Sequence, residues 1–201
     1  MLSVIIATLD SERALLPTLA ALVPGATSGL VREVIVADGG SRDDTAAVAD
    51  VAGCNFRVLE GPLGRRLKTA AAAARAPWLL FVQPGTILDA PWTGETSRFV
   101  QQSSPGGRAA VFRRGASPSL PSPASGGGIG RGLREALSQL MVALGAGPRA
   151  GQGLVIAKQF YDALGGHCER AADPETDLIR RIGRRRIVTL STSAFRTGRY
   201  T

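Results

Sequence analysis

The chain has few of the side chains on which metal sites and nucleophilic enzymes most often depend. Its 201 residues include one histidine, His167, and two cysteines, Cys54 and Cys168. Two cysteines cannot build a disulfide framework, which is typical of a reducing cytoplasm. A single histidine in a late turn excludes a convincing Ser-His-Asp or Cys-His set. His167 and Cys168 are adjacent, but two neighbouring ligands without partners favour a surface turn over a metal site.

Long hydrophobic runs, aromatic residues and lysine are also scarce. No apolar run reaches the roughly 18 residues of a membrane span, and the chain starts on a strand-like segment without a charged leader, so we expect no signal peptide. With 5% aromatic residues and no recognisable module, a specific nucleic-acid partner is not expected. Only Lys68 and Lys158 are lysines, so the net charge of +8 comes mainly from arginine. That charge favours anionic ligands or an acidic membrane face.

The most informative stretch is REVIVADGGSRDDT, residues 32–45. A short apolar run with β-branched residues predicts a strand buried on both faces. The run ends at Asp38, and Gly39, Gly40 and several helix-capping side chains follow. Strand, acid, glycine turn and helix is how an open α/β sheet builds a ligand site at the carboxyl edge of its strands. An ordinary turn with a solvated Asp38 remains the alternative.

Strand and helix patterns alternate along the rest of the chain. Strands are predicted at 2–7, 33–38, 56–59, 78–82, 153–157 and 187–190, with an edge strand at 109–112. Helices are predicted at about 10–23, 41–51, 65–75, 131–144, 159–164 and 173–182. The first of these is irregular up to Pro17, and 24–29 is a loop. This order predicts an α/β fold with a mostly parallel central sheet and crossover helices.

Familiar phosphate-binding motifs are absent. The glycines at 126–132 follow no strand and do not fit a dinucleotide fingerprint, and Lys68 lacks the preceding glycine of a P-loop. The helix that starts near Arg65 instead carries three cations in its first turn, where acids are preferred. Such a violation indicates an anion bound nearby, or simply a solvated basic turn.

Several segments together resemble family 2 glycosyltransferases, most closely the short bacterial branch with a VDGGSxDGT motif. They are SVIIATLDSE, EVIVADGGSRDDT, the Arg-rich alanine helix, WLLFVQPGTIL, RAGQGLVIAKQFYDALGG, and DPETDLIRRIGRR with VTLSTSA. They cover nearly the whole chain outside about 100–130. The resemblance implies the Rossmann-like GT-A fold, which binds a nucleotide-diphosphate sugar and transfers the sugar to an acceptor hydroxyl.

The resemblance also implies an organisation and a site. One domain, 1–201, would comprise a nucleotide-binding half (1–98), a flexible insert rich in Ser, Pro and Gly (99–130), and an acceptor-side half (131–201). The nucleotide-sugar site would include Thr8, Leu9, Asp10, Glu12, Asp38, Gly39, Gln83 and Gln152. Arg65 and Lys68 would lie near the phosphates as point charges.

The acids that hold metal in this family are replaced. Members end the fourth strand with His-Ala-Asp or Asp-x-Asp, which binds Mg²⁺ or Mn²⁺, but here Gln83-Pro84-Gly85-Thr86 follows, and Asp89 is poorly spaced as a substitute. The family's Gly-Asp-Gln is here Ala150-Gly151-Gln152. Hard divalent cations need oxygen ligands, usually charged ones. We therefore assign no metal ligand and no cofactor, although the family implies a divalent ion.

Glu175 is the remaining candidate for acid–base chemistry. It stands in the family's Glu-Asp position and is either the general base or a first-turn helix acid. In an active enzyme Glu175 would deprotonate the acceptor while Arg65 and Lys68 stabilise the diphosphate without metal. The alternative is a degenerate member that binds only nucleotide or a partner. A basic scaffold on a membrane or on nucleic acid rests on charge alone.

The basic tail from Phe195 to Thr201 suggests where the protein works. We expect a cytoplasmic protein that docks at the periphery of the inner membrane, on anionic lipid or on a lipid-linked acceptor. Equal sedimentation with neutral and anionic liposomes would contradict this hypothesis.

Overall fold

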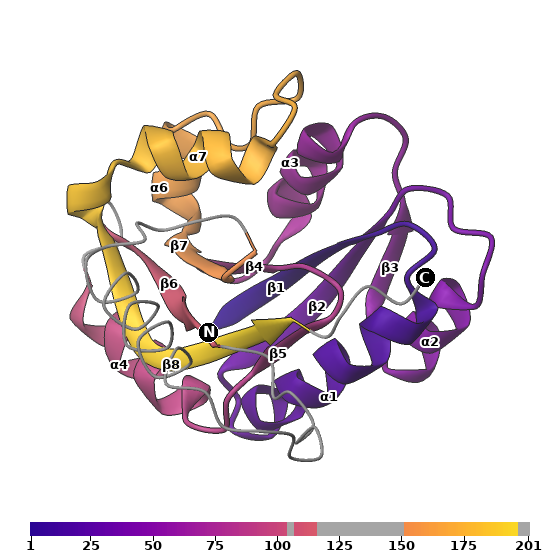
Figure 1. Ribbon diagram of the computed structural model, residues 1–201, viewed down its shortest axis with the longest axis horizontal. Coiled ribbons are helices and arrows are strands. Elements are labelled where there is room, and N and C mark those ends of the chain that lie inside the picture. The colour runs from indigo at the N-terminus through magenta and orange to yellow at the C-terminus, as the bar shows by residue number, and fades with distance from the viewer. Residues whose placement is uncertain (104–106, 116–150, 197–201) are drawn as a thin grey trace, which may run out of the picture.

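A computed structural model describes residues 1–103, 107–115 and 151–196. Within these residues one sheet of eight strands runs in the order β3-β2-β1-β4-β7-β6-β8-β5 (Figure 1). In chain order the strands are β1 (Leu2–Thr8), β2 (Val31–Asp38), β3 (Asn55–Val58), β4 (Trp78–Val82), β5 (Thr86–Leu88), β6 (Ala109–Arg114), β7 (Leu154–Ala157) and β8 (Ile187–Arg196). The helices are α1 (Glu12–Thr27), α2 (Thr45–Val51), α3 (Leu63–Ala73), α4 (Trp92–Gln102), α6 (Lys158–Ala163) and α7 (Pro174–Ile182), with a short 3-10 helix η1 (Arg184–Arg186).

The sheet combines a parallel half with a mixed half. Strands β3, β2, β1 and β4 are parallel to one another, β7 is antiparallel to both β4 and β6, β6 is parallel to β8, and β5 is antiparallel to β8. The predicted α/β fold with a mostly parallel sheet is confirmed. Helices α1 and α2 lie on one face of the parallel half and α3 on the other (Figure 1). The chain adds strands from β1 outward to β3 and then places β4 on the other side of β1. Open α/β sheets bind ligands in the crevice at such a reversal of strand order.

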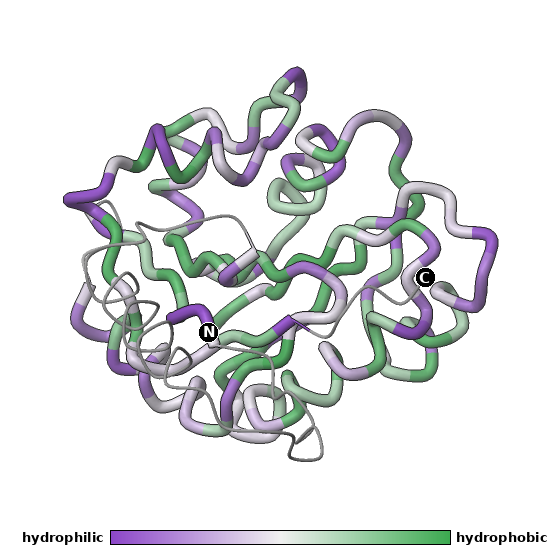
Figure 2. Tube along the Cα trace, viewed as in Figure 1, coloured by the Kyte–Doolittle hydropathy of each residue, from purple (hydrophilic) through white to green (hydrophobic). Residues whose placement is uncertain are grey.

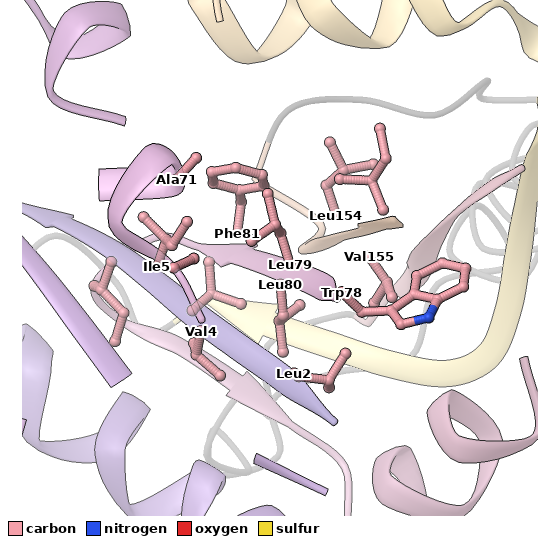
Figure 3. Close-up of a cluster of buried hydrophobic side chains, with 14 of the residues drawn as sticks. Leu2, Val4, Ile5, Ala71, Trp78, Leu79, Leu80, Phe81, Leu154 and Val155 are labelled. Carbon is pink, nitrogen blue, oxygen red and sulfur yellow. The ribbon is translucent and has the colours of Figure 1, made fainter. Parts of the chain in front are cut away.

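The core is built by strands that are apolar on both faces. All five residues of β4 are buried, as are six of the seven in β1, and the middle of the sheet is correspondingly hydrophobic in Figure 2. Figure 3 shows side chains of β1, β4, β7 and α3 packed together there, among them Ile5, Leu80, Phe81, Val155 and Ala71. Because these strands are central, the loops at their carboxyl ends are held on a rigid base.

Helix α1 is longer and more regular than predicted. It runs through Pro17 and Pro24 to Thr27, so the expected irregular start and the loop from residue 24 are both wrong. Each proline removes the donor for the carbonyl four residues earlier, on Arg13 and Ala20. Both of those residues are exposed, where water can satisfy the carbonyl. Burial of the opposite face of the helix outweighs the two lost hydrogen bonds.

Other differences concern the second half of the chain. The sequence did not predict β5 or α4, and β6 is not an edge strand, since β7 and β8 pair with its two sides. Strand β8 is ten residues long, although its apolar start predicts only 187–190; its first residues pair with β6 and its last residues pair with β5. The predicted helix at 131–144, and most of the Ser/Pro/Gly-rich insert, lie outside the described residues. Among the helices of the described parts, none has the length and apolarity to cross a membrane.

Candidate active site

A cavity of about 910 Å³ opens at the carboxyl edge of β1 and β4. Five groups of residues line it: the end of β1 with the start of α1, Asp43 from the loop after β2, the first part of α3, the end of β4 with the turn after it, and side chains from the second half of the chain. They are Ala7, Thr8, Leu9, Asp10, Ser11, Glu12, Arg13, Ala14, Asp43, Leu63, Arg66, Leu67, Val82, Gln83, Pro84, Gly85, Glu175 and Arg196. The structure thus brings together five of the predicted nucleotide-sugar residues, Thr8, Leu9, Asp10, Glu12 and Gln83, with the predicted base Glu175.

The loop after β1 is joined to the loop after β2 by reciprocal hydrogen bonds. The backbone N–H of Asp10 donates to Ser41 Oγ over 2.8 Å, and the N–H of Arg42 donates back to Asp10 Oδ1 over 2.7 Å. The N–H of Glu12, in the first turn of α1, donates to Asp43 Oδ2 over 2.9 Å. Asp10 has a φ of 46°, a left-handed conformation that aspartate tolerates better than most residues. These bonds hold the cavity wall in one shape before any ligand arrives.

Asp38 is a structural centre of this wall and does not line the cavity. It is 1% exposed. Oδ1 accepts from the hydroxyls of Thr8 and Ser41, and Oδ2 accepts from the N–H groups of Gly40 and Ser41. Burial alone would raise the pKa of this carboxyl, but the four hydrogen bonds outweigh it and hold the pKa below its usual value. The solvated turn considered as the alternative is excluded, and the acceptor sites of the carboxylate are occupied by Thr8 of β1 and by Gly40 and Ser41 of its own loop.

We expect the Asp38→Asn variant to lower the free energy of unfolding by about 2–3 kcal/mol. Asparagine keeps one oxygen, so its amide group must face either two hydroxyls or two backbone donors. Because the pKa of Asp38 is depressed, its contribution is present above the unfolded pKa and is lost as the pH falls through the folded value. Urea unfolding at pH 7 and pH 3 measures both effects. An equal loss at the two pH values would contradict this account.

Arg66 is a cavity residue that sequence reasoning missed. Its guanidinium Nη1 donates to the carbonyls of Thr8 over 2.8 Å and Ala37 over 3.1 Å, at the carboxyl ends of β1 and β2. The residue is 9% exposed, and in the described structure its buried Nε has no hydrogen-bond partner. A Cβ on Gly39 would lie 2.7 Å from Nη1, so glycine is needed there to admit the guanidinium. Gly39 therefore acts on the site through Arg66 and does not line the cavity.

Arg65 and Lys68, the cations predicted for this position, are exposed on α3 and do not line the cavity. Helical periodicity is the reason. The buried face of α3 consists of Gly64, Arg66, Leu67, Ala70 and Ala71, so positions 65 and 68 point elsewhere. The same periodicity, applied to the apolar residues of this helix, is the signal that could have identified Arg66.

Glu175 lies in the first turn of α7 and faces the end of β4. Its Oε2 accepts from Gln83 Nε2 over 2.8 Å and from the backbone N–H of Gly151 over 3.0 Å. Burial raises the pKa of this carboxyl above its usual value, and the bonds from Gly151 and Gln83 only partly offset that effect. The N-cap of α7 is Asp173, whose side chain accepts from the N–H of Thr176. Glu175 is therefore free of the capping role and is presented to the cavity with an elevated pKa, as a general base requires.

Gln152 and Asp89 both lie outside the main cavity. Gln152 does not line the main cavity; it lines a smaller one beside it, together with Gln83 and Glu175. Asp89, the poorly spaced substitute for the family's metal ligands, donates its backbone N–H to the carbonyl of Ser193 over 3.1 Å. In the ranges that the structure describes, no three His, Cys, Asp or Glu side chains are grouped so that they could hold a metal ion. The residues present do not fit the divalent ion that the family implies.

The segment that forms most of the cavity wall also matches a known protein family. Residues 3–83, which include β1 to β4 and most of the cavity wall, match the model for Glycosyl transferase family 2. The family 2 resemblance is confirmed. A search of curated proteins finds no match. The short-branch motif VDGGSxDGT stays a prediction.

Solved structures that resemble the chain are GT-A glycosyltransferases, so the predicted GT-A fold is confirmed. Glucosyl-3-phosphoglycerate synthase from Mycobacterium tuberculosis, crystallised with Mn²⁺, uridine diphosphate and glucosyl-3-phosphoglycerate, superposes with a TM-score of 0.67 and 18% identity, over 99% of this chain and 72% of that one. TarS 1-349 from S. aureus, crystallised with UDP-GlcNAc, gives a TM-score of 0.66 and 16% identity, over 100% of this chain. The chain spans 59% of that TarS fragment.

Proposed function

We propose that the protein transfers a sugar from a nucleotide-diphosphate sugar to an acceptor hydroxyl. The observation that carries the proposal is the position of Glu175, a carboxylate with a raised pKa that shares one cavity with the loop after β1. In the proposed reaction the acceptor oxygen bonds to the anomeric carbon and its proton passes to Glu175. The bond from that carbon to the diphosphate breaks, and the nucleoside diphosphate leaves with the electron pair.

The donor nucleotide is assigned to the part of the cavity that is lined by residues within the matched segment 3–83. Thr8, Leu9, Asp10 and Glu12 would contact the nucleotide, and the two structural relatives described above were crystallised with uridine nucleotides. Asp38 would act by holding the loop in shape. This assignment rests on the shape of the wall and on the match of residues 3–83.

In this proposal arginine side chains, in place of a metal ion, stabilise the charge of the diphosphate. Arg66 and Arg196 both line the cavity, and Arg66 has a buried N–H group without a partner in the described structure. A guanidinium binds phosphate oxygens through fixed, directed donors and stays charged at every relevant pH. Positive charge placed at the diphosphate stabilises the negative charge that develops on the leaving group.

Calorimetric titration with UDP and with GDP, each with and without Mn²⁺, tests the proposal. We expect one nucleotide to bind with the same Kd, within about twofold, in both conditions, because the described residues offer no metal-ligand set. The Arg65→Ala variant, which removes an exposed cation outside the cavity, is expected to bind nucleotide with the Kd of the native protein. Binding that tightens strongly with Mn²⁺ would refute the arginine-based site. No binding of either nucleotide would overturn the transferase proposal.

Docking on an anionic membrane stays a prediction. Residues 197–201 of the basic tail lie outside the described residues, whereas the three arginines of η1 are exposed and offer a basic surface. The proposed place at the periphery of the inner membrane, with a lipid-linked acceptor, rests on that charge.

A further inference from the structure

His167 is buried, although the sequence predicts a surface turn for it. It is 1% exposed and follows Gly165 and Gly166, both with positive φ. Its ring packs edge-on against Phe81 of β4, with the two ring centroids 4.7 Å apart. The His167 side chain points into the core because it has a hydrogen-bond partner there, the Tyr161 hydroxyl, which lies 2.8 Å from Nδ1. This histidine in the core beside β4 does not line the main cavity, so it does not contact the proposed substrates.

The contacts of Tyr161 favour one tautomer of the His167 ring. The Tyr161 oxygen accepts from the backbone N–H of His167 over 3.0 Å, so its own O–H is free to donate to Nδ1. Burial raises the pKa of Tyr161 well above its usual value, which keeps this O–H protonated. Nδ1 is then the acceptor and Nε2 carries the ring proton. Nε2 is fully buried and has no partner among the described residues.

A small cavity connects this unpartnered donor with Glu175. His167, Gln83, Gln152 and Glu175 all line it, together with apolar side chains from β4, β6, β7 and α7. The volume open to the centre of a water molecule is about 10 Å³. That is close to the smallest space that holds one water, and polar lining is the other condition for its occupancy.

We propose that one water molecule occupies this cavity, accepts a hydrogen bond from His167 Nε2–H and donates to the Glu175 carboxylate, so that His167 is a positioning residue for Glu175. Nε2–H can only donate, so the water keeps both of its own protons for other acceptors. A carboxylate at the cavity wall is the strongest acceptor within reach. The chain from Tyr161 through His167 and the water therefore favours the ionised form of Glu175 and limits its rotation.

The histidine itself adds no charge in this arrangement. Burial lowers the pKa of His167 to about 4, with the charge of Arg181 acting in the same direction and that of Asp177 opposing it. The imidazole is consequently neutral above about pH 5 and supplies a fixed donor. This role rests on the proposed function only for its catalytic meaning, because the water and its two partners are properties of the folded protein.

Titration of Glu175 by carboxyl-carbon NMR in glutamate-labelled full-length protein tests the inference without an activity assay. The signal is assigned by its loss in Glu175→Gln. We expect His167→Phe, which keeps the ring shape but removes the donor, to raise the midpoint of Glu175 by about half to one pH unit. His167→Gln, whose amide can still donate to the water, should titrate nearer the native protein. A crystal structure should show the water within hydrogen-bond distance of Nε2 and a Glu175 oxygen.

An unchanged midpoint in a folded His167→Phe protein, or an empty cavity in the crystal, would overturn the inference. If His167→Phe does not fold, the presence or absence of the water in a crystal structure of the native protein decides the question. Failure of sugar transfer alone would leave both readouts intact. It would count against the proposed function and not against the water site.

Discussion

Replacing Arg66 with alanine is expected to lower the free energy of unfolding by about 3 kcal/mol. The guanidinium bonds the carbonyls of Thr8 and Ala37 and lies near the buried Asp38, whose charge opposes the lowering of the Arg66 pKa by burial. Its removal leaves these acceptors and Asp38 without their cation. The same variant should lose nucleotide binding, since the diphosphate is proposed to lie beside this residue.

Arg65→Ala supplies the control for this experiment. It removes the same charge one position away, from an exposed side chain, and should change the free energy of unfolding by less than about 0.5 kcal/mol. Urea unfolding followed by circular dichroism, with the slope compared between variants, measures both changes. Equal destabilisation by the two variants would show that general charge, and not the buried contacts of Arg66, supports the fold.

Replacing Glu175 with glutamine is expected to lower kcat by about 10²- to 10⁴-fold, while the Kd for nucleotide changes little. The glutamine oxygen can accept from Gln83 and Gly151 as Oε2 does, so the local structure should persist. Transfer by the native protein should rise with pH through the elevated pKa of Glu175, and this rise should disappear in the variant.

Stability should show the opposite pH dependence from transfer. The folded state raises the pKa of Glu175 above the usual 4.5, so folding is favoured while the group is protonated. This contribution is lost as the pH rises from the unfolded value through the folded one, and Glu175→Gln removes the dependence. Asp177→Asn, on the same helix but bonded to Arg181 on the outside, is the control expected to retain transfer. Native kcat in Glu175→Gln would exclude this residue as the base.

Local patterns in the sequence predicted those elements whose residues agree with their surroundings. Strand β4 and helix α7 appear within a residue of their predicted bounds, because an apolar run and an Asp-Pro helix start are unambiguous. Helix α1 was cut short in the prediction because proline carries a strong local penalty, and only packing on the sheet shows that it is overcome. The full length of strand β8 could not be predicted from the sequence, since its polar half is stabilised by partners distant in the chain.

The residues of the candidate site likewise fall into those that local sequence patterns predicted and those that they missed. Residues at the end of a strand or directly after it, such as Thr8 and Gln83, were predicted to lie together and do lie together, because the sheet aligns the ends of its strands. Arg66 and His167 were missed because their roles depend on which way a side chain points from a helix or a turn. The periodicity of α3 gives the direction of Arg66, but the room for its guanidinium depends on Gly39, 27 residues earlier in the chain. The direction of His167 is set by its contacts with Tyr161 and with Phe81 of β4.

The hydrogen bond from Gln83 to Glu175 has a consequence for the order of folding. It joins residues 92 positions apart, and the pairing of β4 with β7 closes a loop of similar length. Closing a long loop costs entropy before its contacts are made, so this corner should form after the local β1-α1-β2 unit. Loop entropy grows only with the logarithm of length, by about 0.6 kcal/mol per doubling. The connection between the two halves can therefore lengthen or shorten substantially between relatives while the carboxylate keeps its place.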